Sequence, residues 1–323
     1  MSKILIMGGA GYIGSHTVKY LKENNYDCIV ADNLSNGTIK AVENCDFEEA
    51  DLMDIKSLEK VFSKYKIDSV IHFAGLIQVG ESVSDPEIYY QNNVTGTINL
   101  LSVMKKYNVN KIIFSSSAAV YGNPKYLPID ELHPTDPINP YGMTKLMIEK
   151  ILSDYNQAYG LKYIALRYFN ACGCDRSGKI GESHKTETHL IPLVLKAITG
   201  ERKNIQIFGD DYDTYDGTCL RDYIHVEDLA VAHKLALEAL NRFCGVINLG
   251  TSKPISVKQI IKSAEKVSGK SCPIQIVNRR PGDPEKLYAS TNKAKNILNW
   301  EPQITNIDEI ILSAWNWEIN RKF

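Results

Sequence analysis

The sequence predicts an α/β fold, in which a doubly wound parallel sheet covered by helices is joined to a smaller α/β lobe. Two observations support this prediction. Short apolar, β-branched segments alternate with helical patterns over the first 170 residues, and a glycine-rich turn joins the first strand to the first helix. Short apolar strands separated by helices are typical of parallel sheets that are buried on both faces.

The expected elements follow one another in a regular order. Strands are expected at residues 4–7, 28–31, 69–73, 111–115, 163–168 and 246–249. Helices are expected at residues 12–24, 55–65, 94–107, 141–159 and 222–240, and another begins near Ile191 and Pro192. After residue 170 the pattern loosens into loops and shorter elements, without an internal repeat or a Gly/Ser-rich linker. We therefore expect two interleaved lobes.

The composition is that of an ordinary globular protein. The chain has 323 residues, 44% of them hydrophobic, and its 37 basic and 38 acidic residues give a net charge of −1. This balance argues against nucleic acid or an anionic membrane as a partner, because either would require a basic excess. No apolar run approaches the roughly 20 residues of a membrane span, and the first strand is expected to leave no room for a signal peptide. Seven scattered cysteines favour a reducing, cytoplasmic location.

Two groups of potential metal ligands are weak candidates. Cys172 and Cys174 are separated by a single residue, and they lack the second pair that zinc and redox motifs contain. His184 and His189 flank Glu187 but are five residues apart, which would place them off a common helical face. The sequence therefore predicts no metal site.

The clearest motif is the glycine-rich turn. Gly8, Gly11 and Gly14 form a variant of the three-glycine dinucleotide fingerprint, between an apolar strand and a helix. Glycine lets backbone N–H groups approach a pyrophosphate, and the helix N-terminus adds partial positive charge. Asp32 follows 18 residues after Gly14, at the end of the second strand. Its carboxylate can bind a ribose diol and would repel a 2′-phosphate, so the motif predicts NAD rather than NADP in a Rossmann-type sheet.

A tyrosine and a lysine with helical spacing indicate acid–base chemistry. Tyr141 and Lys145 are four residues apart, so in a helix they lie on one face. A nearby cation lowers the pKa of a phenol, which makes Tyr141 a candidate base for a sugar hydroxyl. Upstream, the fourth strand runs into Ser115, Ser116 and Ser117, at the carboxyl edge where parallel sheets bind ligands.

Together with these motifs, the sequence from Gly8 to about Leu298 resembles the nucleotide-sugar 4-epimerases of the extended short-chain dehydrogenase/reductase family. The resemblance rests on dense blocks: GGAGYIGSHT, ADNLSNG, VIHFAGL, SSSAAVYG, NPYGMTK, LRYFNACG, DGTCLRDYIHVEDLA and RRPGD. It implies an NAD-binding domain at residues 1–170, to which residues 222–249 return, and a UDP-sugar-binding lobe at residues 171–323. It also implies a homodimer that forms through the helices near 94–107 and 141–159.

The resemblance also implies a role for each matching residue. The catalytic set would be Ser117, Tyr141 and Lys145. The cofactor contacts would come from Gly8, Gly11, Tyr12, Ile13, Gly14, Asp32, Asn33, Asp51, Leu52, Phe73, Ala74, Gly75, Asn92, Ser115, Tyr141, Lys145 and Tyr168. The substrate contacts would come from Ser117, Tyr141, Phe169, Asn170, His189, Leu190, Gln206, Phe208, Arg221, Arg280 and Asp283. The two arginines would face the diphosphate, because forked guanidinium donors suit phosphate oxygens.

The implied reaction is the reversible 4-epimerisation of UDP-glucose and UDP-galactose. Tyr141 would take the proton of the sugar 4-hydroxyl while C4 gives a hydride to tightly bound NAD. The 4-keto sugar would then rotate about its diphosphate link. The hydride would return to the opposite face of the sugar, so that no net oxidation or reduction occurs.

Two positions depart from the family pattern, and other activities stay open. Ile77 stands where the family often has a lysine that contacts the nicotinamide ribose, and Leu287 stands where the size of the sugar is limited. Leucine is intermediate in size, so UDP-N-acetylglucosamine stays open as a sole or second substrate, as do UDP-pentose 4-epimerisation and UDP-glucuronate decarboxylation. Dehydration is disfavoured, because Ala118 and Ala119 replace the acid–base pair of the dehydratases. A non-catalytic NAD-binding protein would have no need of the catalytic set.

Overall fold

The structure is a computed structural model that describes residues 3–280 and 284–323. Its largest sheet has seven strands in the order β11-β6-β5-β4-β1-β2-β3, and all neighbours are parallel. These strands are β1 (Lys3–Met7), β2 (Cys28–Asp32), β3 (Asp46–Glu49), β4 (Ile67–His72), β5 (Lys111–Ser117), β6 (Lys162–Tyr168) and β11 (Gly245–Leu249). The order reverses between β1 and β4, so the sheet is doubly wound and has its switch point beside the glycine-rich turn.

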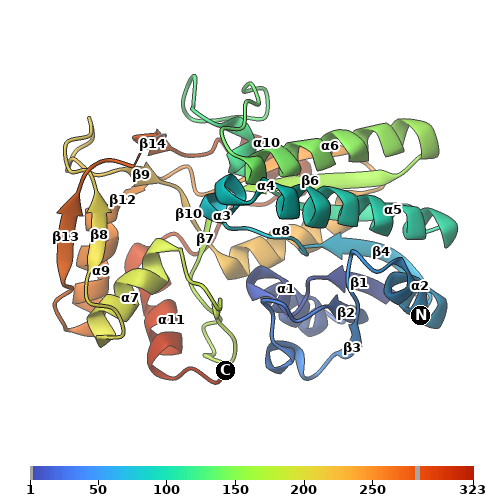
Figure 1. Cartoon of the computed structure of the whole chain (residues 1–323), viewed down its shortest axis with the longest axis horizontal. Helices are drawn as coiled ribbons and strands as arrows, with labels where there is room; N and C mark the ends of the chain where they lie inside the picture. Colours follow the sequence, from blue (N-terminus) through green and yellow to red (C-terminus); the bar gives the residue numbers. More distant parts are fainter. Residues whose placement is uncertain (1–2, 281–283) are drawn as a thin grey trace.

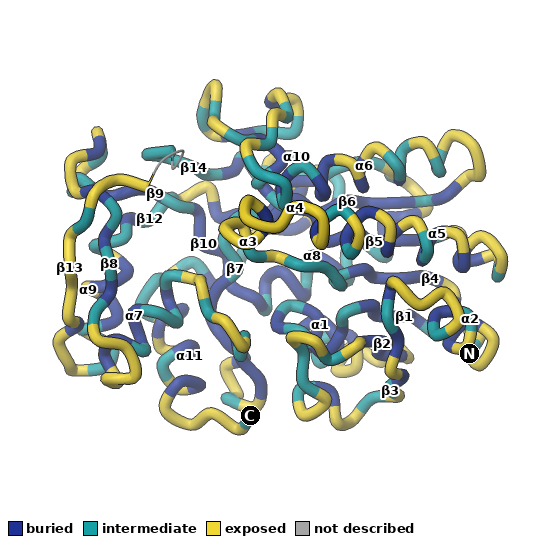
Figure 2. The backbone as a smooth tube through the Cα atoms, viewed as in Figure 1, coloured by how far each residue is buried: buried dark blue, intermediate teal, exposed yellow. Residues whose placement is uncertain are grey.

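Helices bury both faces of this sheet, as the alternation of apolar side chains requires. Ile4 and Ile6 of β1 pack into one core, whereas Leu5 and Met7 pack into the other. The first core is covered by α1 (Tyr12–Glu23), α8 (Val226–Ala239) and α10 (Asn292–Leu298). The second is covered by α2 (Ile55–Lys64), α5 (Gly96–Lys106) and α6 (Pro140–Tyr159). Figure 2 shows the strands between these helices as largely buried.

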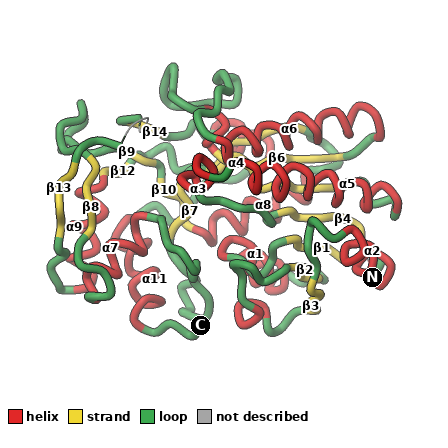
Figure 3. Tube along the Cα trace, viewed as in Figure 1, coloured by secondary structure: helices red, strands yellow, loops and turns green. Residues whose placement is uncertain are grey.

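A smaller half of the molecule lies beside the large sheet (Figure 1). Its core is formed by three helices, α7 (Leu190–Thr199), α9 (Val257–Ser268) and α11 (Ile307–Ile319), and by short strands. The strand pairs are β8 (Ile205–Phe208) with β13 (Ile274–Val277), β7 (Asn170–Cys172) with β10 (Tyr223–His225), and β9 (Leu220–Arg221) with both β12 (Ile255–Ser256) and β14 (Lys286–Leu287). Figure 3 shows that loops make up much of this half.

Short helical segments complete the described chain. They are η1 (Ile39–Val42), α3 (Val79–Ser84), α4 (Pro86–Tyr89), η2 (Tyr90–Thr95) and η3 (Ala118–Tyr121). Among the helices of residues 3–280 and 284–323, none has the length and apolar character that crossing a membrane requires.

The polypeptide passes between the two halves more than once. β11 pairs with β6 at one edge of the large sheet, and α8 packs beneath that sheet. α10 and Trp300, which come much later in the sequence, pack into the same core. The division of the chain at residue 170 stays a prediction. A single boundary there would assign α10 to the smaller half, although α10 packs into the core of the large sheet.

Most of the expected elements are confirmed within two residues at each end, but the helix expected at 222–240 is wrong at its start. Residues Tyr223–His225 form β10, and the helix begins only at Val226. The cause is Asp222, whose buried carboxylate accepts hydrogen bonds from the backbone N–H groups of Thr251, Ser252 and Ala289. These bonds hold Asp222 and the strand that follows it against the interior. β3 is not predicted at all, because its sequence Asp-Phe-Glu-Glu is acidic and only Glu48 is buried.

Candidate active site

One large cleft runs along the carboxyl edge of the parallel sheet and continues into the smaller half. Its volume is about 1330 Å³, and Gly8, Ser117, Phe208 and Arg221 are among its lining residues. Every predicted site residue that the structure describes lines this cleft. Asp283 lies outside the described residues. The structure therefore brings the predicted residues together, while their individual roles stay predictions.

The glycine-rich turn forms a narrow cradle between β1 and α1. Gly8 has a φ of +76°, and a Cβ on it would lie 2.4 Å from the backbone nitrogen of Ala74. A Cβ on Gly14 would lie 2.4 Å from the carbonyl oxygen of Gly8. A Cβ on Gly11 would lie 3.4 Å from that same oxygen and would have no other neighbour within 4 Å. The first and third glycines are thus required for close packing, and the second leaves space where a pyrophosphate can approach the N-terminus of α1.

Asp32 ends β2 and is 7% exposed. Its carboxylate accepts hydrogen bonds from the backbone N–H of Ala10 at 3.0 Å and of Leu34 at 2.8 Å. Burial raises the pKa of Asp32, and the two N–H donors oppose that rise. Next to it, the amide of Asn33 donates to Asp51 at 2.8 Å. These contacts fix the acidic end of β2 beside the glycine-rich turn, as recognition of a ribose diol requires.

The residues expected to carry the chemistry come from the end of β5 and the start of α6. Asn139 caps α6 by accepting a hydrogen bond from the N–H of Gly142 at 2.8 Å. One turn later, the ammonium of Lys145 donates to the carbonyl of Ser115 at 2.8 Å and lies 5.8 Å from the centre of the Tyr141 ring. The hydroxyl of Ser117 lies near the phenol of Tyr141, where it favours the phenolate form. The three side chains therefore form one group at the edge of the sheet.

Burial dominates the acid–base properties of this group. It lowers the pKa of Lys145 to about 8, and the carboxylate of Glu149 opposes the shift. Burial raises the pKa of Tyr141, and the nearby hydroxyl of Ser117 opposes that shift. The prediction of a lowered pKa for Tyr141 is therefore wrong for the protein without cofactor, because desolvation of the phenolate is the dominant effect.

The smaller half supplies the other wall of the cleft. The guanidinium of Arg280 stacks 4.2 Å from the centre of the Phe208 ring. Arg221 lies on β9, and β9 pairs with β14, the strand that carries Leu287. The side chain of Leu287 packs with Phe169 against a small apolar cluster. The smaller half thus combines cationic and apolar groups in the cleft, as a nucleotide sugar requires.

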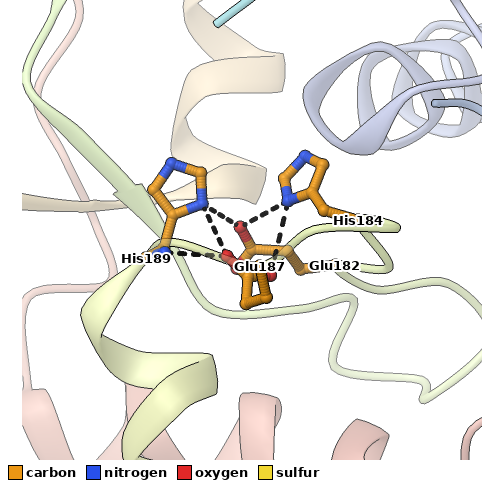
Figure 4. A group of neighbouring side chains, drawn as sticks. All are labelled: Glu182, His184, Glu187 and His189. Carbon is orange, nitrogen blue, oxygen red and sulfur yellow. Dashed lines mark hydrogen bonds and ion pairs between the residues drawn. The ribbon is translucent and has the colours of Figure 1, made fainter. Parts of the chain in front are cut away.

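The prediction that His184 and His189 lie apart is wrong. The segment that contains them is a loop rather than a helix, and its side chains converge with those of Glu182 and Glu187 (Figure 4). One ligand atom from each of the four residues lies within 4.8 Å of the others. Sequence spacing could not reveal this cluster, because a loop has no fixed side-chain period.

Sequence reasoning also missed part of the cleft wall. The missed lining residues include Ser35, Asn36, Gly37, Gly122, Asn123, Cys219 and Tyr223. The Ser-Asn-Gly run is a turn signal directly after the acidic end of β2, so its position beside a cofactor could have been anticipated. Cys219 and Tyr223 carry no comparable signal in the sequence.

Comparisons with known proteins agree with this arrangement. Residues 4–250 match the NAD dependent epimerase/dehydratase family. A UDP-glucose 4-epimerase from Halalkalibacterium halodurans is 51% identical over 97% of this chain and 95% of its own. The crystal structure of UDP-glucose 4-epimerase from Brucella ovis in complex with NAD has a TM-score of 0.95 and is 48% identical, over 98% of both chains. That of the Bifidobacterium longum enzyme in complex with NAD⁺ and UDP has a TM-score of 0.94 and is 44% identical, over 99% of both chains. This chain belongs to the NAD-dependent epimerase/dehydratase family.

Proposed function

We propose that this protein is an NAD-dependent isomerase that interconverts UDP-glucose and UDP-galactose by inverting C4 of the sugar. The observation that carries the proposal is the meeting of three features in one cleft. The hydroxyls of Tyr141 and Ser117 lie close together, the glycine cradle lies at the same sheet edge, and Arg221 and Arg280 line the same cleft. The names of the full-length relatives support the same activity.

The residues of the chain fit NAD. The cradle between β1 and α1 would hold the pyrophosphate, and Asp32 would bind the adenosine ribose. Asp51, Leu52 and the segment from Phe73 to Gly75 line the same part of the cleft. When bound, NAD supplies the chemistry that amino acids lack, which is to accept a hydride and to return it.

The chain itself binds the sugar nucleotide and moves a proton. Tyr141 would take the proton of the 4-hydroxyl, and the nearby hydroxyl of Ser117 would orient the phenol. Lys145, held by the carbonyl of Ser115, places positive charge on the same face of α6. Arg221 and Arg280 would neutralise the diphosphate and leave the sugar free to turn about that link. Presentation of the opposite face of the 4-keto sugar then inverts C4.

The other activities that the sequence leaves open are not favoured. The relatives that this chain matches over nearly their whole length are named UDP-glucose 4-epimerases. Ala118 and Ala119 line the cleft beside Ser117 and cannot transfer protons, so dehydration lacks its acid and base. A binding protein without activity would not require Ser117, Tyr141 and Lys145 together in the cleft.

Replacement of Tyr141 by phenylalanine tests the proposal. The wild-type enzyme should convert UDP-galactose to UDP-glucose without added NAD, and Tyr141→Phe should retain NAD but lose about 10²- to 10⁴-fold in kcat, the usual contribution of general acid–base catalysis. Tyr159→Phe is the matched control, because Tyr159 is on the same helix but is 54% exposed. Wild-type turnover in the Tyr141 variant would remove that residue from the mechanism. A wild-type protein with bound NAD that fails on UDP-hexoses would refute the assignment.

We further propose that the enzyme is a cytoplasmic homodimer. All seven cysteines are free thiols, which supports a reducing location. Ile98 on α5 and Met147 on α6 are exposed, and they lie on the two helices that the resemblance implies as the dimer interface. Light scattering after gel filtration should give twice the chain mass of 36.2 kDa. A mass of one chain at micromolar concentration would contradict the dimer.

A further inference from the structure

Four side chains with metal-binding atoms converge in the loop that precedes α7 (Figure 4). The Nδ1 atom of His189 lies 2.7 Å from Glu182 and 3.1 Å from Glu187. The Nδ1 atom of His184 lies 3.3 Å from Glu182 and 3.4 Å from Glu187. Each imidazole thus presents the same nitrogen to both carboxylates, and the four groups surround one point.

Hydrogen bonds within the cluster leave part of it unsatisfied. An imidazole Nδ1 carries at most one proton, yet each of the two Nδ1 atoms faces two carboxylate oxygens. The Oε1 atom of Glu182 is buried and has no hydrogen-bond partner of acceptable geometry, although both imidazoles are close to it. The side chain of Glu182 is only 4% exposed, so water does not replace the missing partner. A buried carboxylate oxygen aimed at two ring nitrogens indicates a cation at the common point.

We propose that Glu182, His184, Glu187 and His189 bind a divalent transition metal, for which zinc is the best fit. Two imidazoles and two carboxylates are an ordinary donor set for zinc, which takes four ligands in a tetrahedron. Bonds of about 2.0–2.1 Å place neighbouring ligand atoms about 3.3 Å apart in such a tetrahedron. The four nitrogen–oxygen distances, from 2.7 to 3.4 Å, approach that spacing. Two negative carboxylates would also balance the charge of the metal.

The surroundings of the cluster hold the ligands in place. The backbone N–H groups of Thr188 and His189 donate to Glu187 Oε1 at 2.7 and 2.8 Å, which fixes that carboxylate. The indole of Trp317 donates to the carbonyl oxygen of Glu182 at 3.0 Å and anchors its backbone to α11. Contacts of this kind orient the ligands of known metal sites and are part of their affinity. The side chain of His189 is 44% exposed and lines the cleft, so a metal can enter from there.

Four protein ligands leave no open coordination position, so the metal would be structural rather than catalytic. It would fix the loop that carries His189 and Leu190, two residues that line the cleft. The ring of His184 is also in edge contact with the ring of Tyr12, with 6.1 Å between their centres. The metal would thus join the smaller half to the start of α1.

Metal binding to the holoenzyme tests this proposal in the absence of substrate. The protein, made without a histidine tag and stripped with a chelator, should take up one equivalent of zinc per chain in calorimetry. Cobalt should give the intense visible absorption of a tetrahedral site. Glu182→Gln and His184→Gln should each weaken zinc binding at least about 100-fold, since each removes a direct ligand. Thr186→Ala is the control in the same loop and should bind zinc like the wild type.

Several outcomes would overturn the proposal. They are no uptake of zinc by the wild type at 100-fold excess, zinc uptake that Glu182→Gln leaves unchanged, or a cobalt spectrum typical of six-coordinate aqueous ions. The cobalt spectrum of the wild type decides the question even if a variant fails to fold, and retained NAD together with circular dichroism reports on folding. Epimerase activity is not a readout here, so failure of the metal site and failure of the proposed function remain distinguishable.

Discussion

The buried histidines make the stability of this enzyme sensitive to acid, and His233 allows a quantitative test. Its ring lies on α8, 4.7 Å from the ring of Phe73 and 6.1 Å from that of Tyr168, measured between centres. Its Nδ1 contacts the carbonyl of Leu229 at 2.8 Å, and its Nε2 is buried without a partner. Burial lowers the pKa of His233 to about 4, although the contact with the Leu229 carbonyl opposes the shift.

The magnitude follows from the difference between the folded and unfolded pKa. Because His233 titrates at about 4 when folded and at about 6.5 when unfolded, the unfolded chain binds more protons between those values. Stability is therefore lost as the pH falls from 6.5 toward 4. One such group costs about 2 kcal/mol between pH 7 and pH 5, from the relation of about 1.36 kcal/mol per pKa unit. His16, His72 and His225 are also buried, and burial lowers each pKa in the same way, to about 4, 3 and 3.

Replacement of His233 by phenylalanine removes one of these four contributions. The free energy of unfolding is measured by urea titration with saturating NAD, at pH 7 and at pH 5. Both proteins should lose stability between these pH values, and we expect the loss in His233→Phe to be about 2 kcal/mol smaller than the loss in the wild type. Any packing cost of the phenylalanine is present at both pH values and cancels in this difference, as do the contributions of the other titrating groups. In the wild type, the NMR signal of His233 should remain that of a neutral ring at pH 5. Equal losses of stability in the two proteins would refute the reasoning.

Two further substitutions test the cradle and the support beneath the catalytic group. Gly8→Ala should yield folded protein without bound NAD, because the added Cβ would lie 2.4 Å from the backbone nitrogen of Ala74 and the residue has a φ of +76°. Gly80→Ala is the control, because a Cβ added there would meet no atom within 4 Å outside its own helix and its chain neighbours. The measurement is the amount of NAD released when each protein is denatured. Full NAD content in Gly8→Ala would contradict this. Glu149→Gln should lower the free energy of unfolding by about 3–5 kcal/mol, because the carboxylate pairs with Arg167, both are about 5% exposed, and the guanidinium would lose its counter-charge. A urea midpoint equal to that of the wild type would contradict this expectation.

Local patterns predict the parts of this fold whose side chains repeat regularly. The strand before Gly8, the helix after it and the helix that carries Tyr141 and Lys145 are all confirmed. They are predictable because each shows apolar periodicity and has a glycine or a proline at one end. The start of α8 is not predictable in this way. It depends on Asp222, whose hydrogen-bond partners come from residues 251, 252 and 289, and no local pattern encodes them.

The same distinction holds for the site. The predicted contacts that the structure describes all line one cleft, because most of the conspicuous blocks lie next to a strand end; the exception is NPYGMTK, which begins α6. The cluster of Glu182, His184, Glu187 and His189 escapes sequence reasoning, because a loop brings the four side chains together and helical spacing is the wrong measure for it. The pKa of Tyr141 escapes it too, because burial depends on the packing of the whole molecule.

The carboxylate of Asp222 has a consequence for how the enzyme works. Its two oxygens accept from the N–H and hydroxyl of Thr251 and from the N–H groups of Ser252 and Ala289, and its neighbour in the sequence is Arg221. Arg221, which we propose faces the diphosphate, is therefore anchored through Asp222 to the segment that leaves the large sheet after β11. A wide hinge motion there would have to break several buried hydrogen bonds at once. The part of the cleft wall that carries Arg221 is thus fixed to the large sheet before any ligand binds, so we expect substrate binding to require little closure of the cleft.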